Sequence, residues 1–140
     1  MAGSVTQSVT QTRNGDLRVW CVNLEWVGDS ANGTIPSTAI ESSIMAKVQG
    51  LYLFRARTIP GAGTAPTTLY DIVVNDADSV DVMGGTLANR SATVTETIVP
   101  LQDVTANLYG PVYCGTALTM VISNQAVHSA TGTLRLYFSA

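Results

Sequence analysis

The sequence predicts an all-β protein, either an antiparallel β-sandwich or a jelly-roll-like barrel of about eight or nine short strands. Apolar and polar residues alternate with period two in several segments, which is typical of half-buried strands. No segment carries an apolar stripe of 3.6-residue period over three helical turns. Turns rich in Gly, Pro, Asn and Asp separate the strand-like segments at short intervals. These patterns together exclude a helical bundle.

The strongest predicted strand runs from Leu17 to Val27, where four large apolar side chains fall on one face: Trp20, Val22, Leu24 and Trp26. The opposite face is half apolar. Because a strand that is apolar on both faces is usually buried on both, we expect this one in the middle of a sheet with cover on each side.

The C-terminal third predicts a hairpin across the loop from Asn124 to Ala130. Alternation puts one apolar row on each strand: Leu118, Met120 and Ile122 before the loop, and Leu134, Leu136 and Phe138 after it. A further strand is expected from Ala46 to Thr58. Its two faces would hold Tyr52, Phe54 and Ala56 on one side and Leu51, Leu53, Arg55 and Arg57 on the other.

Other segments give weaker signals. Ile40 to Met45 is ambiguous, Thr93 to Val99 reads as a strand, and Leu101 to Tyr109 reads as a connection or one short helix. Gly28 to Thr38 is expected to be a long exposed loop. His128 is the only histidine and lies in the last predicted turn, where a solvent-facing position is expected.

The N-terminal residues 1–13 are expected to form an extended arm, and residues 14–140 a single β domain. Ser4 to Thr12 contains the near-duplicate SVTQ-SVTQ, in which Val5 and Val9 are the only apolar residues. Such a segment buries too little area to order alone. It is therefore either an edge strand or an arm that orders against another chain.

The composition limits the class of partner. Hydrophobic residues make up 46% of the chain and charged residues only 12%, with a net charge of −3. A surface with few charges suits burial against neighbouring subunits, since few ions need to be desolvated. The absence of a basic run argues against nucleic acid, and the absence of a long apolar span argues against a membrane. The first residues have no pattern of a secretory signal.

Candidate chemistry is sparse. Asp76 and Asp78, with Asp81 three residues further on, place carboxylates like the start of a calcium loop, but the sixth-position Gly and twelfth-position Glu are missing. An ordinary turn, in which Asp bonds nearby backbone, is the favoured interpretation. Cys21 and Cys114 are expected to be buried free thiols. With no catalytic or phosphate-binding motif, we expect no enzyme activity and no cofactor.

The segment from Ala65 to Arg90, APTTLYDIVVNDADSVDVMGGTLANR, predicts a β-hairpin: a strand from Leu69 to Val74, an acidic turn, and a short strand from Val80 to Met83. This segment resembles one found in small structural proteins of tailed bacteriophages, with the pattern AP, LYD, D-x-D, D-V, GG and NR. The resemblance covers the middle quarter of the chain. It implies a virion protein assembled in the host cytoplasm.

The favoured functional hypothesis is a capsid decoration, or cement, protein that binds the outside of the head and stabilises neighbouring major capsid subunits. The resemblance implies a homotrimer. We expect the contacts in segments chosen for exposure and polarity, at Val5, Thr6, Val9, Asn32, Thr34, Ile35, Asp76 and Asp78. The alternative is a β module associated with a tail or head fibre that recognises a surface glycan through exposed aromatic residues.

Overall fold

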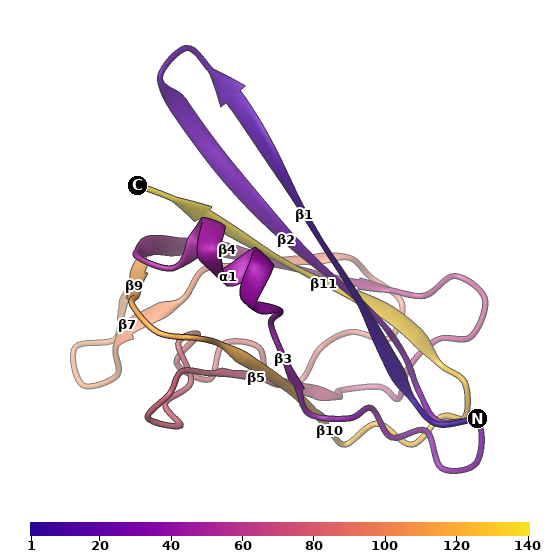
Figure 1. The fold of residues 1–140 in the computed structure, drawn as a ribbon. Helices are drawn as coiled ribbons and strands as arrows, with labels where there is room; N and C mark the ends of the chain where they lie inside the picture. The colour runs from indigo at the N-terminus through magenta and orange to yellow at the C-terminus, as the bar shows by residue number, and fades with distance from the viewer.

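The computed structural model describes residues 1–140 as a β-sandwich of two antiparallel sheets (Figure 1). The large sheet has the strand order β1-β2-β11-β4-β6, and β9 also pairs with β4. Its strands are β1 (Ser4–Asn14), β2 (Leu17–Val27), β11 (Thr131–Ser139), β4 (Leu51–Pro60), β6 (Glu96–Ile98) and β9 (Val112–Cys114).

The second layer is smaller. It has the order β3-β10-β5, with β3 (Thr38–Ala39), β10 (Thr119–Ser123) and β5 (Asp71–Asn75). A separate two-stranded sheet pairs β7 (Leu101–Asp103) with β8 (Leu108–Tyr109). The one helix, α1 (Ser42–Val48), is too short to cross a membrane.

The all-β prediction is confirmed, and of the two architectures the structure has the sandwich. The expected eight or nine strands are eleven, because β3, β7, β8 and β9 have only two or three residues each. Alternation cannot be recognised over so few positions. Three strands are also far from short, since β1 and β2 have 11 residues and β4 has 10.

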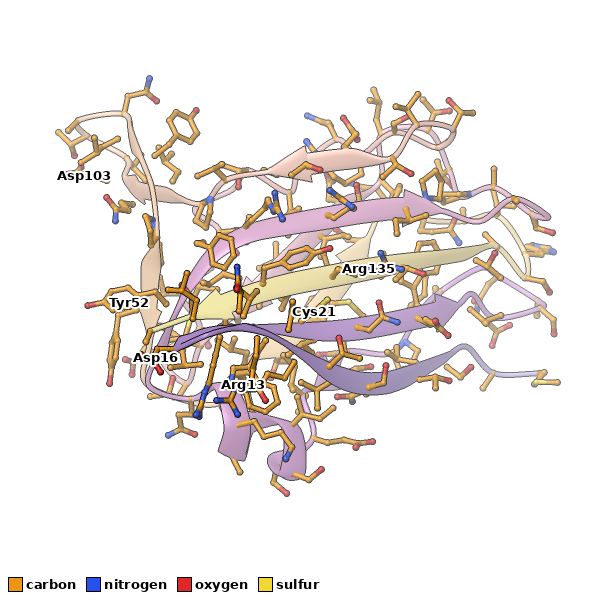
Figure 2. The ribbon with its side chains drawn as sticks, turned by 90° about the horizontal axis from the view of Figure 1, so that it is seen from above. Arg13, Asp16, Cys21, Tyr52, Asp103 and Arg135 are labelled. Atoms are coloured by element: carbon orange, nitrogen blue, oxygen red, sulfur yellow. The ribbon has the colours of Figure 1, made fainter.

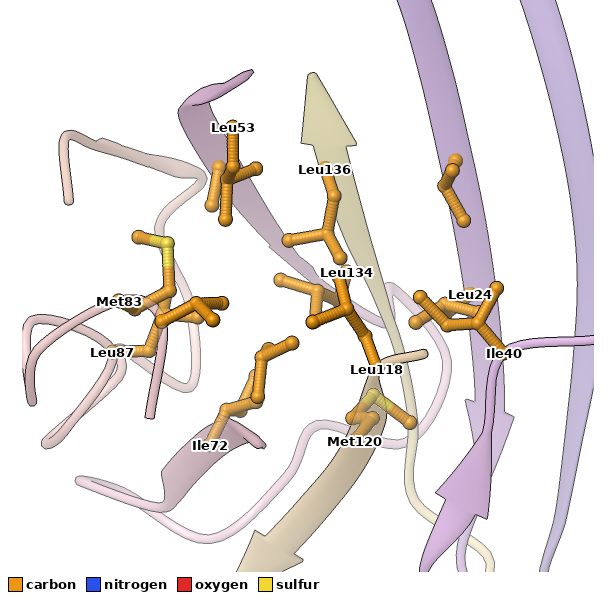
Figure 3. Packing of buried hydrophobic residues seen from close by; sticks show 14 of the residues in the cluster. Leu24, Ile40, Leu53, Ile72, Met83, Leu87, Leu118, Met120, Leu134 and Leu136 are labelled. Carbon is orange, nitrogen blue, oxygen red and sulfur yellow. The ribbon is translucent and has the colours of Figure 1, made fainter. Parts of the chain in front are cut away.

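One hydrophobic core of 24 buried residues fills the space between the sheets (Figure 3). The large sheet supplies inward rows such as Leu134 and Leu136 of β11, and the small sheet supplies Ile72 and Met120. Trp26 packs edge-on against Tyr70 with ring centroids 5.6 Å apart. Burial of these side chains, each worth roughly 1.5–3 kcal/mol, drives the two sheets together.

The predicted C-terminal hairpin is wrong, although its buried rows are right. β10 pairs with β5 and β3 in the small sheet, whereas β11 lies between β2 and β4 in the large sheet. The apolar rows of β10 and β11 therefore face each other across the core. Alternation identifies the buried face of a strand, but it does not identify the strand's neighbour.

The expected strand from Ala46 begins five residues later, because residues up to Val48 belong to α1. Ile44, Met45 and Val48 bury one side of this helix against the core. A seven-residue helix gives too short an apolar stripe to be recognised from the sequence.

The expected hairpin in the acidic segment is reduced to its first strand and a turn. β5 is followed by a single bridge between Asn75 and Asp81, and residues 82–87 form turns instead of a strand. Val82, Met83 and Leu87 are buried there and contribute to the core. Downstream, the expected strand from Thr93 to Val99 is shortened to β6, and the expected connection from Leu101 contains the β7–β8 hairpin.

The N-terminal segment is an edge strand and not a free arm. β1 pairs with β2 over its whole length, from Ser4 opposite Val27 to Asn14 opposite Leu17. Gly15 and Asp16 form the two-residue turn, with Gly15 at φ +63°. Beyond the pair of Val19 with Ser139, the end of this hairpin has no β11 beside it and projects from the sandwich (Figure 1).

Candidate binding surfaces

The outer face of the large sheet has a distinctive composition (Figure 2). Three of the chain's seven basic residues lie there in strand interiors: Arg55, Arg57 and Arg135. Arg57 and Arg135 are direct cross-strand partners on β4 and β11. The one ion pair of the chain joins Arg90 to Glu96, the first residue of β6. The three arginines therefore have no carboxylate within salt-bridge distance.

Neutral side chains hold these arginines in place. Arg135 Nε donates to Asn23 Oδ1 at 3.0 Å, and Arg57 Nε donates to Thr97 Oγ1 at 3.1 Å. The Arg55 guanidinium lies 4.8 Å from the centre of the Tyr137 ring, a cation–π distance. Asn23 Nδ2 also donates to Glu25 Oε1 at 3.2 Å, so the three oriented arginines share this face with one carboxylate that forms no ion pair with them.

A β-bulge at Phe54 creates part of this arrangement. Along β4, Arg55 pairs with Tyr137 but the next β11 residue pairs with Leu53, which leaves Phe54 as an extra residue. Phe54 and Arg55 consequently both point outward, and the Phe54 and Tyr137 rings lie 6.3 Å apart. The sequence predicted Leu53, Arg55 and Arg57 on one face of β4. This prediction is wrong beyond Leu53, because Leu53 points into the core whereas Arg55 and Arg57 point outward. Bulges often re-aim side chains next to functional sites.

Cys21 occupies the same face, beside Arg135. It helps to line a shallow hollow of about 200 Å³ together with Ser8, Thr10, Asn23 and Arg135. Burial raises the pKa of the Cys21 thiol above its ordinary value, and the nearby Arg135 charge offsets part of that rise. Cys21 is only half-buried, so the expectation of two buried thiols holds fully for Cys114 alone. Both are free cysteines.

The face ends in an exposed aromatic pair. Tyr52 of β4 and Tyr113 of β9 are cross-strand partners with ring centroids 5.7 Å apart, and their exposed fractions are 45% and 59%. Most of the other aromatic residues are wholly or partly buried, as expected from packing. This pair was not distinguished in the sequence, because β9 is too short to reveal its pairing.

A larger hollow of about 620 Å³ lies under the projecting hairpin. Three parts of the chain line it: residues 16–20 of the hairpin, Lys47 of α1 with Leu51 at the start of β4, and residues 139–140 at the end of β11. Lys47 Nζ is 5.7 Å from the centre of the Trp20 ring. The hollow is open and mixes both charges with apolar side chains.

The free side of β1 is the second exposed feature of the large sheet. No backbone hydrogen bond involves residues 4–14 apart from the ladder with β2. Gln7 anchors the strand from its inner face, since its amide donates to Ala39 O at 3.0 Å and accepts from Glu41 N at 2.9 Å. Val5 and Val9 are half-buried against the core, and Thr6 is exposed. The predicted contacts of this segment thus lie on an ordered strand.

The other predicted contacts do not gather into one site. Asn32 and Thr34 are exposed and bond each other, with Asn32 Oδ1 accepting from Thr34 Oγ1 at 2.7 Å. Ile35 was expected to be accessible but is buried, with 7% exposure, and belongs to the core. An apolar residue within a polar loop folds inward because its transfer from water is favourable.

Backbone amides donate to two of the three carboxylates of the acidic turn, those of Asp76 and Asp81. Asp76 Oδ1 accepts from the amides of Asp78 and Val80 at 2.9 and 3.0 Å, as in an ordinary Asp turn. Asp81 Oδ1 accepts from the amides of Val74 and Met83, and its Oδ2 accepts from that of Gly85. No three His, Cys, Asp or Glu residues are placed to hold a metal ion.

Histidine chemistry has no geometric support. His128 lies exposed in the loop between β10 and β11, as expected. No hydrogen bond joins it to a carboxylate or a hydroxyl nucleophile, the contacts that a triad would require. What the surface residues offer is recognition through cations, hydroxyls, aromatic rings and exposed backbone.

The comparisons with known proteins are sparse. No protein-family model and no curated protein matches the chain. Among solved structures, the chain is similar to the CBM22-1 xylan-binding domain from Paenibacillus barcinonensis Xyn10C, with 16% identity, 99% of this chain and 96% of that domain covered, and a TM-score of 0.39. At this TM-score the likeness is too distant to bear on a binding site.

Proposed function

We propose that this chain is a non-catalytic virion protein of a tailed bacteriophage, a decoration protein that binds the outside of the head and stabilises neighbouring major capsid subunits. The observation that carries the proposal is the 11-residue edge strand β1, whose outer side has no partner within the chain. Its partner would be a strand or extended segment of a neighbouring subunit, added by β-augmentation.

The backbone geometry supports strand addition at this edge. In an antiparallel pair, every second residue turns its N–H and C=O away from the partner strand. The two-residue turn puts a hydrogen-bonded pair at Asn14 and Leu17, so the outward-turned groups belong to the odd-numbered residues from Val5 to Arg13. A long, flat edge with few protecting devices attracts another strand. Here only Arg13 places a charge on the strand.

Two further features support the proposal. With 12% charged residues, the surface can be covered by a neighbour at small desolvation cost. The segment from Ala65 to Arg90 also resembles one found in phage structural proteins. A protein that contacts several capsid subunits at once favours the assembled shell, since it binds that state and not the separated subunits. Each copy in a trimer would add to this effect.

Co-sedimentation with expanded heads, assembled from the major capsid protein of the same phage, tests the proposal. Gln11 is exposed, and its N–H is expected to point outward. Gln11→Pro should therefore weaken head binding at least tenfold by removing that donor, whereas the control Gln11→Ala, which keeps the donor, should bind like the unmodified protein. Failure of the unmodified protein to bind heads, or equal binding by both variants, would overturn the β1 contact.

A second candidate is a fibre-associated or receptor-binding module that recognises a surface glycan. The exposed pair of Tyr52 and Tyr113 favours it, since sugars stack on aromatic rings. The two functions separate in experiment. Glycan binding by the isolated protein without head binding would favour the second. Light scattering on the purified chain (14.7 kDa) measures the expected trimer directly.

A further inference from the structure

We propose that the outer face of the large sheet is a binding site for an anionic polysaccharide whose carboxylates are held by Arg55, Arg57 and Arg135. The site is distinct from the β1 edge, and the inference does not depend on head binding. It follows from the charge, the anchoring and the linear arrangement of side chains on this face.

The first step concerns charge. Arg57 and Arg135 are direct cross-strand partners, so their Cβ atoms lie about 4.5–5.5 Å apart. Like charges at such positions are unfavourable for folding. Arg55 adds a third cation two residues along β4. Within the chain this charge is only partly compensated: Glu25 lies on the same face and accepts from Asn23 Nδ2 at 3.2 Å, but no carboxylate is within salt-bridge distance of these arginines. An external anion would relieve this repulsion.

The second step concerns geometry. Asn23 and Thr97 hold the Nε atoms of Arg135 and Arg57. The terminal Nη groups of both arginines have no partner in the chain, and these are the atoms that grip a carboxylate in a forked arrangement. The neighbouring Phe54 and Tyr137 rings both contact the Arg55 guanidinium, with centroids 5.9 and 4.8 Å from its Cζ. The cations are therefore preorganised.

The third step concerns the shape of the ligand. The exposed pair of Tyr52 and Tyr113 lies next to the arginines along the same face. Tyr137 pairs with Arg55, and two residues further along β11, Ser139 pairs with Tyr52, which in turn pairs with Tyr113. Figure 2 shows Arg135 and Tyr52 at separate places along this face. With about 3.3 Å per residue, the strip is roughly 13–16 Å long. It suits an extended oligomer that carries both anions and apolar faces, as uronic acid sugars do.

The surface favours a polysaccharide over other polyanions. Recurrent peptide-binding modes use sheet edges or grooves, whereas this strip is the face of a sheet. Hydroxyls flank the cations on both edges of the sheet, from Ser8 and Thr10 on β1 and from Thr97 on β6, and these suit sugar hydroxyl groups.

Calorimetric titration with polygalacturonate at low salt tests the inference, with neutral dextran, polyglutamate and single-stranded DNA as comparison probes. We expect polygalacturonate to bind and dextran not to bind. Arg57→Gln with Arg135→Gln should raise the Kd tenfold or more, because each charged hydrogen bond contributes about 1.5–3 kcal/mol. Tyr113→Ala should weaken binding at the other end of the strip.

Arg13→Gln is the control for the loss of positive charge away from the strip, since it removes one cation from the exposed hairpin end. It should change the Kd less than twofold. The double variant should also keep or raise the Tm of the unliganded protein, because it removes a repulsive pair, whereas arginines of purely structural value would lower it. Absence of polygalacturonate binding, equal loss in Arg13→Gln, or tighter binding of DNA or polyglutamate would each overturn the inference.

Discussion

Gly132 provides a sharp test of the packing between β11 and the indole of Trp26. A Cβ at position 132 would lie 2.3 Å from Trp26 Cζ2 and 2.6 Å from Cε2, far inside van der Waals contact. The indole has little room to retreat, because it is 1% exposed and packs against Tyr70. Gly132→Ala therefore forces a shift in the core.

The magnitude combines two opposing terms. Overpacking of a core costs about 1–3 kcal/mol. Replacing glycine by alanine in a strand interior recovers roughly 0.5–1 kcal/mol of backbone entropy. The net loss is about 1–2 kcal/mol, which lowers the Tm by roughly 4–8 °C at about 4 °C per kcal/mol for a chain of this size.

Thermal unfolding followed by circular dichroism measures this change. Gly63→Ala is the control, because a Cβ at position 63 meets no atom within 4 Å and the backbone is not left-handed there. Its Tm should stay the same or rise slightly. Trp26→Phe should reduce the cost of Gly132→Ala by supplying a smaller ring. If Gly132→Ala unfolds at the temperature of the unmodified protein, the described contact between β11 and Trp26 is refuted.

Four further changes probe the core, the acidic turn and the buried titratable groups. Leu136→Ala should destabilise the fold by about 2–5 kcal/mol in urea unfolding, since the side chain is fully buried; a loss below 1 kcal/mol would contradict that burial. Asp81→Ala should cost roughly 1–3 kcal/mol in the same assay, because its carboxylate satisfies three backbone amides, and full stability would show that these bonds contribute nothing. Burial raises the pKa of the Cys114 thiol to about 11, so iodoacetamide at pH 8 should label Cys21 first and Cys114 only after unfolding. Mass spectrometry of the digested protein measures the order of labelling, and labelling of Cys114 before Cys21 would contradict this expectation. Burial also raises the pKa of Tyr70 from 10.0 to about 12, so its contribution to stability is complete below pH 10 and is lost as the pH rises from 10 to 12. Tyr70→Phe should remove this part of the decline in stability. If the variant shows the same dependence of stability on pH as the unmodified protein, the raised pKa of Tyr70 is refuted.

The fold class was predictable because alternation in long strands reports burial directly. Leu17 to Val27 was predicted with its correct bounds, and its inward residues Val22, Leu24 and Trp26 are buried. The outer face of β2 was expected to be covered but is open, because half-apolar residues such as Val19 tolerate partial exposure. Sequence periodicity thus identified the buried face of β2 correctly, but it did not show that the opposite, half-apolar face is open to solvent.

Strand neighbours and the candidate site were much less predictable. Pairing of β11 between β2 and β4 depends on contacts between distant parts of the chain, which no local pattern records. The Phe54 bulge shifts Arg55 and Arg57 to the outer face, against the alternation expected for β4. The available signal was the presence of arginines inside strand-like segments, since an unpaired charge in a strand must face solvent or a ligand.

The position of β11 has a consequence for biosynthesis. β11 joins β2 to β4 and follows both in the sequence, so the large sheet cannot close until residues 131–139 have been synthesised. Until then, β2 and β4 each expose an unpaired edge and an apolar row, which are the features that nucleate aggregation. A truncation that removes β11 would therefore leave two separate half-sheets with unpaired edges and exposed apolar rows. We expect such a product to aggregate and to have no partial function.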